Sequence, residues 1–233
     1  MRDIFLGVLA HDLRTPLSAA TLFAECIVLD AGTPPRSIEA ALRIQRSTKQ
    51  MKMLVDGLLD LTHTRLGQVL PITPTDANMA AICEQAAAEL RAISPSTKLT
   101  VVLEGDLRGV WDAGRLSQLI SNLLVNAVRH GKPEGPVSLN ARVGDSGVTV
   151  TVTNEGEAIP KEIIAGLFEP FVHGDSGGES HTGAGLGLGL FIARQIALAH
   201  RGRLDAVSDG RQTEFRLSIP RQKSVEVRRA FVV

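Results

Sequence analysis

Apolar residues recur at helical spacing in two long stretches at the start of the chain. The first runs from about Ile4 to Asp30 and the second from about Ser37 to Leu66. Apolar residues three or four positions apart line one face of a helix, so each stretch predicts an amphipathic helix. Residues 32–35, Gly-Thr-Pro-Pro, separate the two, because glycine and proline break helices and favour turns. The pattern predicts a helical hairpin over residues 1–68.

The apolar stripe of this hairpin has nothing within the first 68 residues to cover it completely. Two copies of the hairpin can bury their stripes against each other as a four-helix bundle. We therefore expect a homodimer through the helical hairpin, in the form of a dimeric four-helix bundle. The alternative is that the stripe packs on the rest of its own chain.

The pattern changes after residues 69–75, a proline-containing stretch that we interpret as a linker. Residues 76–220 combine helical patterns with short β-branched runs that are broken by glycine. Helices are expected at about 77–93, 112–128 and 186–200, and strands at about 99–103, 109–111, 137–143, 148–153, 203–208 and 213–219. This order indicates an α+β domain with helices on one face of a mixed sheet. Residues 221–233 form a tail, for which we expect a frayed end; a docked strand is the alternative.

The composition excludes several classes of function. The 25 basic and 25 acidic residues cancel, so there is no electrostatic footprint for nucleic acid or for an anionic membrane surface. No apolar run approaches the roughly 18 residues needed to cross a bilayer, and the first residues lack a signal-peptide pattern. Cys26 and Cys83 have no spacing typical of a zinc site. We expect a cytoplasmic protein with reduced thiols, no nucleic-acid partner and no direct membrane insertion.

The first candidate for chemistry is the motif His11-Asp12-Leu13-Arg14-Thr15-Pro16, in the first predicted helix. A neutral imidazole has one protonated nitrogen and one free lone pair, and Asp12 can hold the proton while the other nitrogen attacks. Pro16 has no N–H for the carbonyl of Asp12, so we expect a bend next to His11, with Thr15 one turn further on. By itself a His followed by an acid is more typical of a solvated helix face. Its interpretation depends on three later motifs.

The first of these is a pair of asparagines, Asn122 and Asn126, in a predicted helix. Because they lie four residues apart, both amides share one helix face while the intervening leucines serve the core. An amide oxygen is a hard ligand that suits Mg²⁺, and Arg129 and His130 lie one turn further on, within reach of phosphate oxygens. A solvated helix face is the ordinary alternative.

The second is a glycine run, residues 183–190, which reads Gly-Ala-Gly-Leu-Gly-Leu-Gly-Leu and leads directly into a predicted helix. Glycines let backbone N–H groups approach phosphates closely, and the N-terminus of a helix favours negative charge. A glycine-rich turn is the ordinary alternative, but four glycines at alternating spacing favour a phosphate site. P-loop and Rossmann sites are excluded, because the chain lacks G-x-x-x-x-G-K-[ST] and the run does not follow a strand of a βαβ unit.

The third is a strand that ends in the polar turn Asn154-Glu155-Gly156-Glu157-Ala158. Between this turn and the glycine run lie Phe168 and Phe171, followed by small polar residues at 173–180. A flexible segment between two anchored elements is what a lid over a nucleotide requires.

Taken together, these motifs resemble the catalytic core of a two-component sensor histidine kinase over about residues 1–220. The resemblance implies a dimerisation and phosphotransfer hairpin, followed by a Bergerat-type α/β sandwich that binds ATP and Mg²⁺. It implies that His11 accepts the γ-phosphoryl group, that Asp12 acts as base, and that Thr15 positions water for dephosphorylating the partner. The implied partner is the receiver domain of a response regulator, whose aspartate takes the phosphoryl group.

The resemblance also assigns a nucleotide site. It makes Asn126 the Mg²⁺ ligand, with Asn122 beside it, and lets Arg129 and His130 reach the phosphates. The other cofactor-binding positions that it implies are Asn154, Gly156, Ala158, Phe168, Gly183, Gly185, Leu186 and Gly187.

One turn departs from the family pattern. The family usually has Asp-x-Gly-x-Gly, in which the Asp accepts from the adenine amino group, whereas this chain has Asn154 and Ala158. An amide oxygen still accepts, but more weakly than a carboxylate, and Ala158 adds a methyl group beneath the base. The competing hypothesis is a non-catalytic or weakly ATP-binding phosphotransfer scaffold of the same fold. A more remote one, a chaperone or topoisomerase ATPase domain, is disfavoured by the His11 hairpin.

Overall fold

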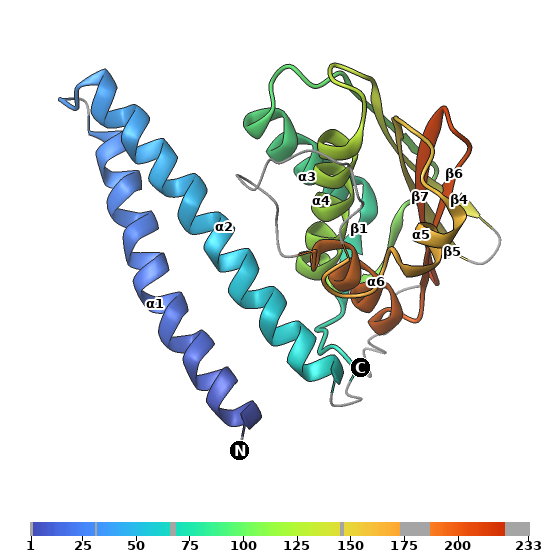
Figure 1. Cartoon of the computed structure of the whole chain (residues 1–233), viewed down its shortest axis with the longest axis horizontal. Coiled ribbons are helices and arrows are strands. Elements are labelled where there is room, and N and C mark those ends of the chain that lie inside the picture. The colour runs from blue at the N-terminus through green and yellow to red at the C-terminus, as the bar shows by residue number, and fades with distance from the viewer. Residues whose placement is uncertain (1, 31, 66–68, 145–146, 173–186, 222–233) are drawn as a thin grey trace, which may run out of the picture. The chain divides into compact units, whose positions relative to one another are not determined.

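The computed structural model describes residues 2–30, 32–65, 69–144, 147–172 and 187–221. Within these ranges the chain forms two compact units. The first contains the helical hairpin, and the second starts at Val69 and contains the sheet (Figure 1).

The first unit is a hairpin of α1 (Arg2–Leu29) and α2 (Pro35–Arg65). α2 begins with Pro35, whose fixed φ and missing N–H suit the first position of a helix. Small residues line the seam, where Ala24 and Ala41 are 2% and 1% exposed. Across the same seam the hydroxyl of Thr21 donates to the hydroxyl of Thr48 at 2.9 Å. The predicted hairpin is confirmed, and this partly buried polar pair fixes the register of its two helices.

The second unit is built on a five-stranded sheet in the order β2-β4-β5-β7-β6. Its strands are β2 (Leu99–Glu104), β4 (Val137–Gly144), β5 (Gly147–Glu155), β6 (Arg203–Ser208) and β7 (Gln212–Ile219). β2 and β4 run parallel, and the other neighbouring pairs are antiparallel. The expected mixed sheet is confirmed.

Three helices cover one face of this sheet: α3 (Met79–Ile93), α4 (Ala113–His130) and α6 (Gly189–Ala199) (Figure 1). Along β5 the buried positions alternate, so that Val148, Val150 and Val152 face the helices while the residues between them stay half-buried. Asn154 is the next position in this series and therefore points to the helix-covered face at the end of the central strand. The buried row of β5 valines is thus continued by Asn154, a polar candidate residue.

Two short elements are absent from the sequence-based prediction. β1 (Thr75–Asn78) pairs antiparallel with β3 (Arg108–Trp111) in a separate two-stranded sheet. The helix expected from Ala77 therefore begins at Met79, where the side chain of Asn78 caps it by accepting from the N–H of Ala80 at 3.0 Å. The second is α5 (Lys161–Gly166), a six-residue helix after Pro160.

The stretch expected as a linker is bonded to the second unit. The N–H of Thr73 donates to the carboxylate of Asp112 at 2.8 Å. Pro220, which follows β7, is bonded near the same point of the second unit. The indole of Trp111, the neighbour of Asp112, donates to its carbonyl at 3.0 Å. The linker over residues 69–75 stays a prediction; from Thr73 onward the chain is hydrogen-bonded to the sheet domain.

Candidate active site

The motif from His11 to Pro16 lies in the first half of α1. The helix continues through Pro16, and the bend expected next to His11 stays a prediction. The side chains of His11 and Asp12 lie outside the described residues. Thr15 is exposed on the following turn.

An ion pair joins this turn of α1 to α2. The Nε of Arg14 donates to Oδ1 of Asp56 at 2.8 Å, and its Nη2 lies 2.6 Å from the same oxygen. Both groups are partly open to solvent, so the pair contributes more to orientation than to stability. It fixes the rotation of α1 one turn away from His11.

The two candidate asparagines lie on one face of α4, as predicted. The side chain of Asp112 caps the start of this helix by accepting from the N–H of Arg115 at 3.0 Å. The apolar face of α4 is fully buried, which leaves Asn122 and Asn126 half-buried on its flank. Arg129 and His130 are exposed in the last turn of the same helix.

The two asparagines differ in their contacts. Nδ2 of Asn122 donates to the carbonyl of Gly189, the first residue of α6, at 3.0 Å. The side chain of Asn126 makes no hydrogen bond with any other residue in the described ranges. Its amide is therefore presented to solvent or to a ligand one turn away from the contact between Asn122 and α6.

Asn154 is held tightly at the end of β5 and is 4% exposed. Its Nδ2 donates to the carbonyl of Glu155 at 3.2 Å, and the same carbonyl accepts from the N–H of Lys132 at 2.8 Å. Oδ1 of Asn154 has no hydrogen-bond partner among the described residues. Because Nδ2 is committed, the amide offers an acceptor, which is the group that an adenine amino donor requires.

Gly131, which caps the C-terminus of α4, lets this helix approach Asn154 closely. A Cβ at Gly131 would lie 2.5 Å from the carbonyl oxygen of Ala127, 3.1 Å from that of Glu155 and 3.2 Å from Nδ2 of Asn154. There is no room for a side chain. Sequence reasoning missed Gly131 as a site residue, although a glycine directly after a helix that carries two candidate asparagines is a usable signal.

The rest of the turn rests on the β6–β7 connection. Gly156 is buried, and its N–H donates to the carbonyl of Arg211 at 3.2 Å. Ala158 is exposed, and a Cβ built on Gly210 would lie 3.6 Å from its methyl group. The methyl group of Ala158 therefore faces the β6–β7 turn, and its expected position beneath a base stays a prediction.

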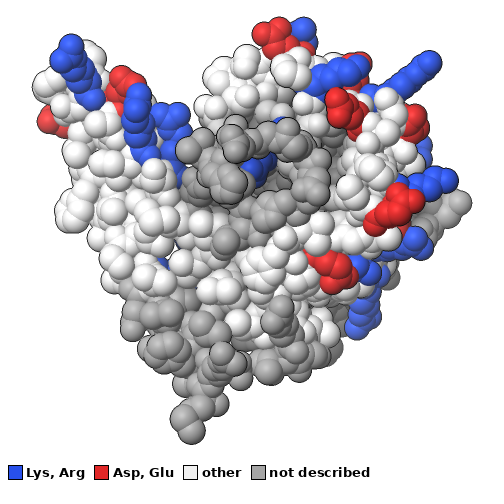
Figure 2. Space-filling view, in the orientation of Figure 1, with Lys and Arg blue, Asp and Glu red and all other residues white. Residues whose placement is uncertain are grey.

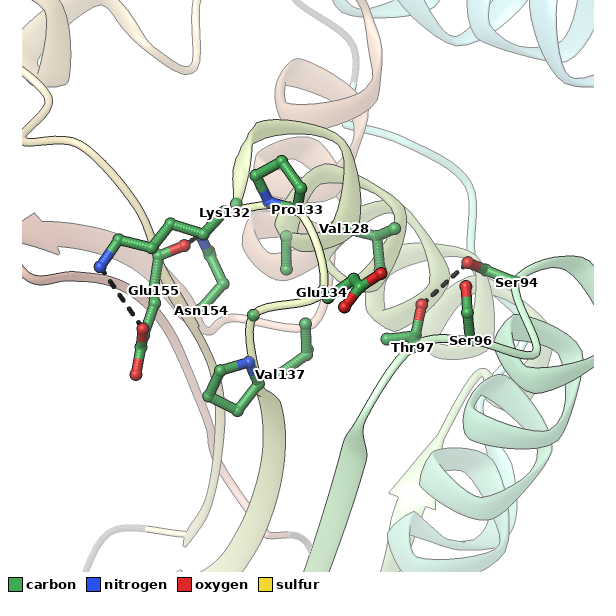
Figure 3. A pocket seen from close by; sticks show the side chains of 14 residues that line it. Ser94, Ser96, Thr97, Val128, Lys132, Pro133, Glu134, Val137, Asn154 and Glu155 are labelled. Carbon is green, nitrogen blue, oxygen red and sulfur yellow. Dashed lines mark hydrogen bonds and ion pairs between the residues drawn. The ribbon is translucent and has the colours of Figure 1, made fainter.

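A cavity of about 210 Å³ lies behind this turn (Figure 3). Its lining includes Ser94 and Thr97 after α3, and Lys132, Asn154 and Glu155 at the other end. Lys132 and Glu155 form an exposed ion pair with Nζ and Oε2 3.5 Å apart. The lining contains neither Asn122 nor Asn126, so we do not assign this cavity to the nucleotide.

Phe168 is part of the core rather than of an open surface. It is 8% exposed, and its ring packs edge-on against Phe215 of β7, with centroids 6.5 Å apart. The guanidinium of Arg194 lies over the other side of the ring, 5.8 Å from its centroid. Phe168 thus anchors the segment after α5 to the sheet and to α6.

The glycine run is described only at its end. Gly183, Gly185 and Leu186 lie outside the described residues. Gly187 has φ of +67°, a conformation that favours glycine, and α6 starts two residues later at Gly189 instead of at the expected Leu186. The run therefore enters α6 through a left-handed residue.

The described residues contain no group of three or more His, Cys, Asp or Glu side chains gathered as a metal site. No described helix is both long enough and apolar enough to span a membrane.

Two family models match the chain in the order that its motifs indicate. Residues 1–67 match the His Kinase A (phospho-acceptor) domain. Residues 111–223 match the family of histidine kinase-, DNA gyrase B- and HSP90-like ATPases.

Relatives match across the junction of the two domains. A bacteriophytochrome of Pseudomonas aeruginosa is 34% identical over 206 residues, which are 88% of this chain and 28% of the relative. The sensor histidine kinase TrcS of Mycobacterium tuberculosis is 34% identical over 225 residues, which are 93% of this chain and 43% of the relative. The chain thus spans less than half the length of these two relatives.

The fold is shared with solved structures. Full-length ShkA in complex with AMPPNP aligns with a TM-score of 0.67 and 23% identity, over 94% of this chain and 46% of that chain. With a phospho-acceptor domain followed by an ATPase domain, and with relatives that match across both, the chain belongs to the two-component sensor histidine kinases and comprises their catalytic core.

Proposed function

We propose that this chain is an ATP-dependent protein-histidine kinase. It transfers the γ-phosphoryl group of ATP to His11 and then to an aspartate in the receiver domain of a response regulator. The observation that carries the proposal is the arrangement along α4. Gly131 at the C-terminal end lies beside Asn154, and Asn122 in the middle of the helix binds the start of α6. At about 1.5 Å per residue the two positions are about 13 Å apart, a length that suits an extended nucleoside triphosphate.

The side chains along this line match the parts of ATP. Oδ1 of Asn154 accepts from the adenine amino group, and the exposed Arg129 and His130 meet the phosphates. Asn126 offers an amide oxygen without a competing partner in the described ranges. This fits Mg²⁺, which prefers hard oxygen ligands and is held largely by phosphates and water, so that one protein oxygen suffices. When bound, the ion supplies neutralisation of the phosphate charge.

The phosphoryl transfer uses the hairpin. The unprotonated nitrogen of His11 attacks the γ-phosphorus, and an N–P bond forms as the bond to the β,γ-bridging oxygen breaks and ADP leaves. Asp12 accepts the proton from the other ring nitrogen, which leaves a neutral phosphoimidazole. Thr15 orients the water that removes a phosphoryl group from the response regulator. Most of the rate enhancement comes from positioning and charge neutralisation.

A homodimer through the hairpin is part of the proposal. Large apolar side chains on both helices are exposed in the single chain, with Leu22 59% and Phe23 68% exposed on α1. Others are Leu13, Ile27, Leu42, Met51 and Leu58. Burying them in a four-helix bundle stabilises the pair by about 25 cal/mol per Å² of apolar surface.

On the face drawn in Figure 2, acidic and basic side chains of the sheet domain lie interspersed. The proposal therefore keeps a protein, and not a nucleic acid, as the partner. We place the reaction in the cytoplasm, where ATP is available.

The decisive experiment is to incubate the purified chain with Mg²⁺ and γ-labelled ATP and to measure acid-labile, alkali-stable label. We expect label on the parent, none on His11→Ala and little on Asn126→Ala. His63→Ala, in α2, is the matched control and should keep the label. Calorimetric titration with a non-hydrolysable ATP analogue separates binding from transfer.

A folded parent that takes up no label would refute the kinase proposal and favour the scaffold hypothesis. Label that survives in His11→Ala would refute the assignment of the acceptor. Because the analogue titration is independent of transfer, it also shows whether the neutral acceptor Asn154 is sufficient for binding.

A further inference from the structure

Asn122 and Asn126 belong to the same face of α4 but have different surroundings. The side-chain amide of Asn122 is bonded to α6, because its Nδ2 donates to the carbonyl of Gly189 at 3.0 Å. The side chain of Asn126 has no hydrogen-bond partner in the described part of the chain. Two chemically identical side chains one turn apart therefore have separate tasks.

Gly189 is the residue at which the glycine run becomes a helix. The preceding Gly187 is left-handed with φ of +67°, and α6 starts at Gly189. The contact from Asn122 reaches the carbonyl of this first residue and not its N–H. The first N–H groups of α6 have no partner within the helix, so they stay available to an anion while the backbone is held from the other side.

The surroundings of this contact favour a fixed position. α4 and α6 pack directly on each other, and Asn122 is half-buried beside their seam. A Cβ at Gly189 would lie 3.8 Å from Cγ and 3.9 Å from Oδ1 of Asn122, at ordinary van der Waals distance. The amide is thus in close contact with the start of α6, and its orientation is set by its role as donor.

We infer that Asn122 is a positioning residue that fastens the exit of the glycine run to α4, and that it is not a ligand of the metal ion. This inference rests on the proposed function for its consequence, namely that the first turn of α6 lies at the phosphates. Asn126 alone then supplies the amide oxygen to the ion. Asn122 acts one step away, by holding the backbone N–H groups that meet the nucleotide.

Asn122→Asp separates the two roles chemically. A carboxylate is at least as good a ligand for Mg²⁺ as an amide oxygen, but at neutral pH it has no hydrogen to donate. It would also direct a charged oxygen at the carbonyl of Gly189. A ligand role predicts that Asn122→Asp works as well as the parent, whereas a positioning role predicts that it fails as Asn122→Ala does.

The first measurement is hydrogen exchange of the amides from Ala193 onward in α6, the first whose N–H groups have partners within the helix, in the full chain without nucleotide. We expect exchange about fivefold faster in both Asn122→Ala and Asn122→Asp, which corresponds to one lost hydrogen bond. Gly189→Ala is the matched control, because a methyl group fits there and the bond from Asn122 is kept. Unchanged exchange in both Asn122 variants would overturn the inference.

The second measurement is binding of an ATP analogue as a function of Mg²⁺ concentration. Asn126→Ala should raise the Mg²⁺ midpoint about tenfold or more, whereas Asn122→Ala and Asn122→Asp should weaken analogue binding with the midpoint unchanged. A midpoint shift in Asn122→Ala as large as that in Asn126→Ala, or full binding by Asn122→Asp, would assign Asn122 to the metal instead. If the parent binds no analogue, the proposed function fails, while the exchange experiment still decides whether Asn122 holds α6.

Discussion

Removing one hydrogen bond at Asp112 tests how the sheet domain is held at its start. Oδ1 of Asp112 caps α4 by accepting from the N–H of Arg115 at 3.0 Å, and Oδ2 accepts from the N–H of Thr73 at 2.8 Å. Its own N–H donates to Nε2 of His200 at 3.1 Å. One carboxylate thus joins the chain before β1 to the helix that carries the candidate asparagines.

Substitution of Asp112 by Asn or by Ala removes different numbers of the two hydrogen bonds that its carboxylate accepts. Asparagine caps helices as well as aspartate does, but its amide has a single acceptor oxygen. Asp112→Asn therefore loses one of the two bonds, and we expect the free energy of unfolding to fall by about 1 kcal/mol. Asp112→Ala loses the cap as well, and we expect a fall of about 2 kcal/mol.

The chain provides its own probe for this measurement. Trp111, the neighbour of Asp112, is the only tryptophan and is 2% exposed, so its fluorescence reports unfolding of the sheet domain. Equilibrium unfolding in urea gives the free energy from the midpoint and slope. Glu157→Gln, which removes a charge from an exposed side chain, is the control and should change stability by less than about 0.5 kcal/mol.

The stability lost in Asp112→Asn should also depend on pH. Burial raises the pKa of the Asp112 carboxyl, but hydrogen bonds from the backbone N–H groups of Arg115 and Thr73 outweigh it and hold the pKa below its ordinary value. A lowered pKa in the folded state stabilises the protein above the unfolded pKa of about 3.9, and this contribution disappears as the pH falls through the folded value. The difference between parent and Asp112→Asn should be constant near neutral pH and shrink in acid. Equal stability of parent and Asp112→Asn at pH 7, or an equal loss in Asn and Ala, would refute this reasoning.

Two further substitutions test the site, and one thiol reaction tests the core. Gly131→Ala forces a Cβ to 2.5 Å from the carbonyl oxygen of Ala127, so we expect about 2 kcal/mol lower stability and weaker binding of an ATP analogue by calorimetry; unchanged affinity would contradict the role of this close approach. Gly187→Ala places a side chain at φ of +67°, which costs about 1 kcal/mol, and its analogue affinity should fall without a change in the Mg²⁺ midpoint. Burial, assisted by a neighbouring acid, raises the pKa of the Cys83 thiol to about 12, so a thiol reagent at pH 8 should label only the exposed Cys26 until the chain is unfolded; two fast thiols in the native protein would contradict this burial.

The regular parts of the fold were predictable because their patterns are local. The alternation Val148, Val150, Val152 identifies a half-buried strand, and the same series extended by one step places Asn154 on the helix-covered face. The helical spacing of Asn122 and Asn126 placed both amides on one face of α4 for the same reason. A period of two or of 3.6 residues is enough for such inferences.

Other features depend on partners far along the chain. The strand Thr75–Asn78 has neither a β-branched run nor alternation, and it exists because β3 pairs with it. The six residues of α5 are too few to show a helical period. Phe168 was assigned to the cofactor by resemblance, yet its ring lies between Phe215 and Arg194, both of which come later in the chain. The bond between Asn122 and Gly189 likewise joins residues that no local pattern connects.

The departure of this chain from the Asp-x-Gly-x-Gly pattern is consistent with the surroundings of Asn154. The carbonyl of Glu155 lies 3.2 Å from Nδ2, where a carboxylate would place a second acceptor against it. The buried carboxylate would also lie near Glu155, the last residue of β5, and near Glu157 in the turn that follows. An amide avoids both conflicts, because its N–H₂ satisfies the carbonyl while Oδ1 remains for the ligand. Asn154 therefore gives up the strength of a charged acceptor but gains a fixed orientation. The carbonyl that holds Nδ2 is itself fixed by the N–H of Lys132, which directly follows the C-cap residue of α4. In the proposed kinase the same helix that presents Asn126 to the metal thus also sets the direction of the adenine acceptor.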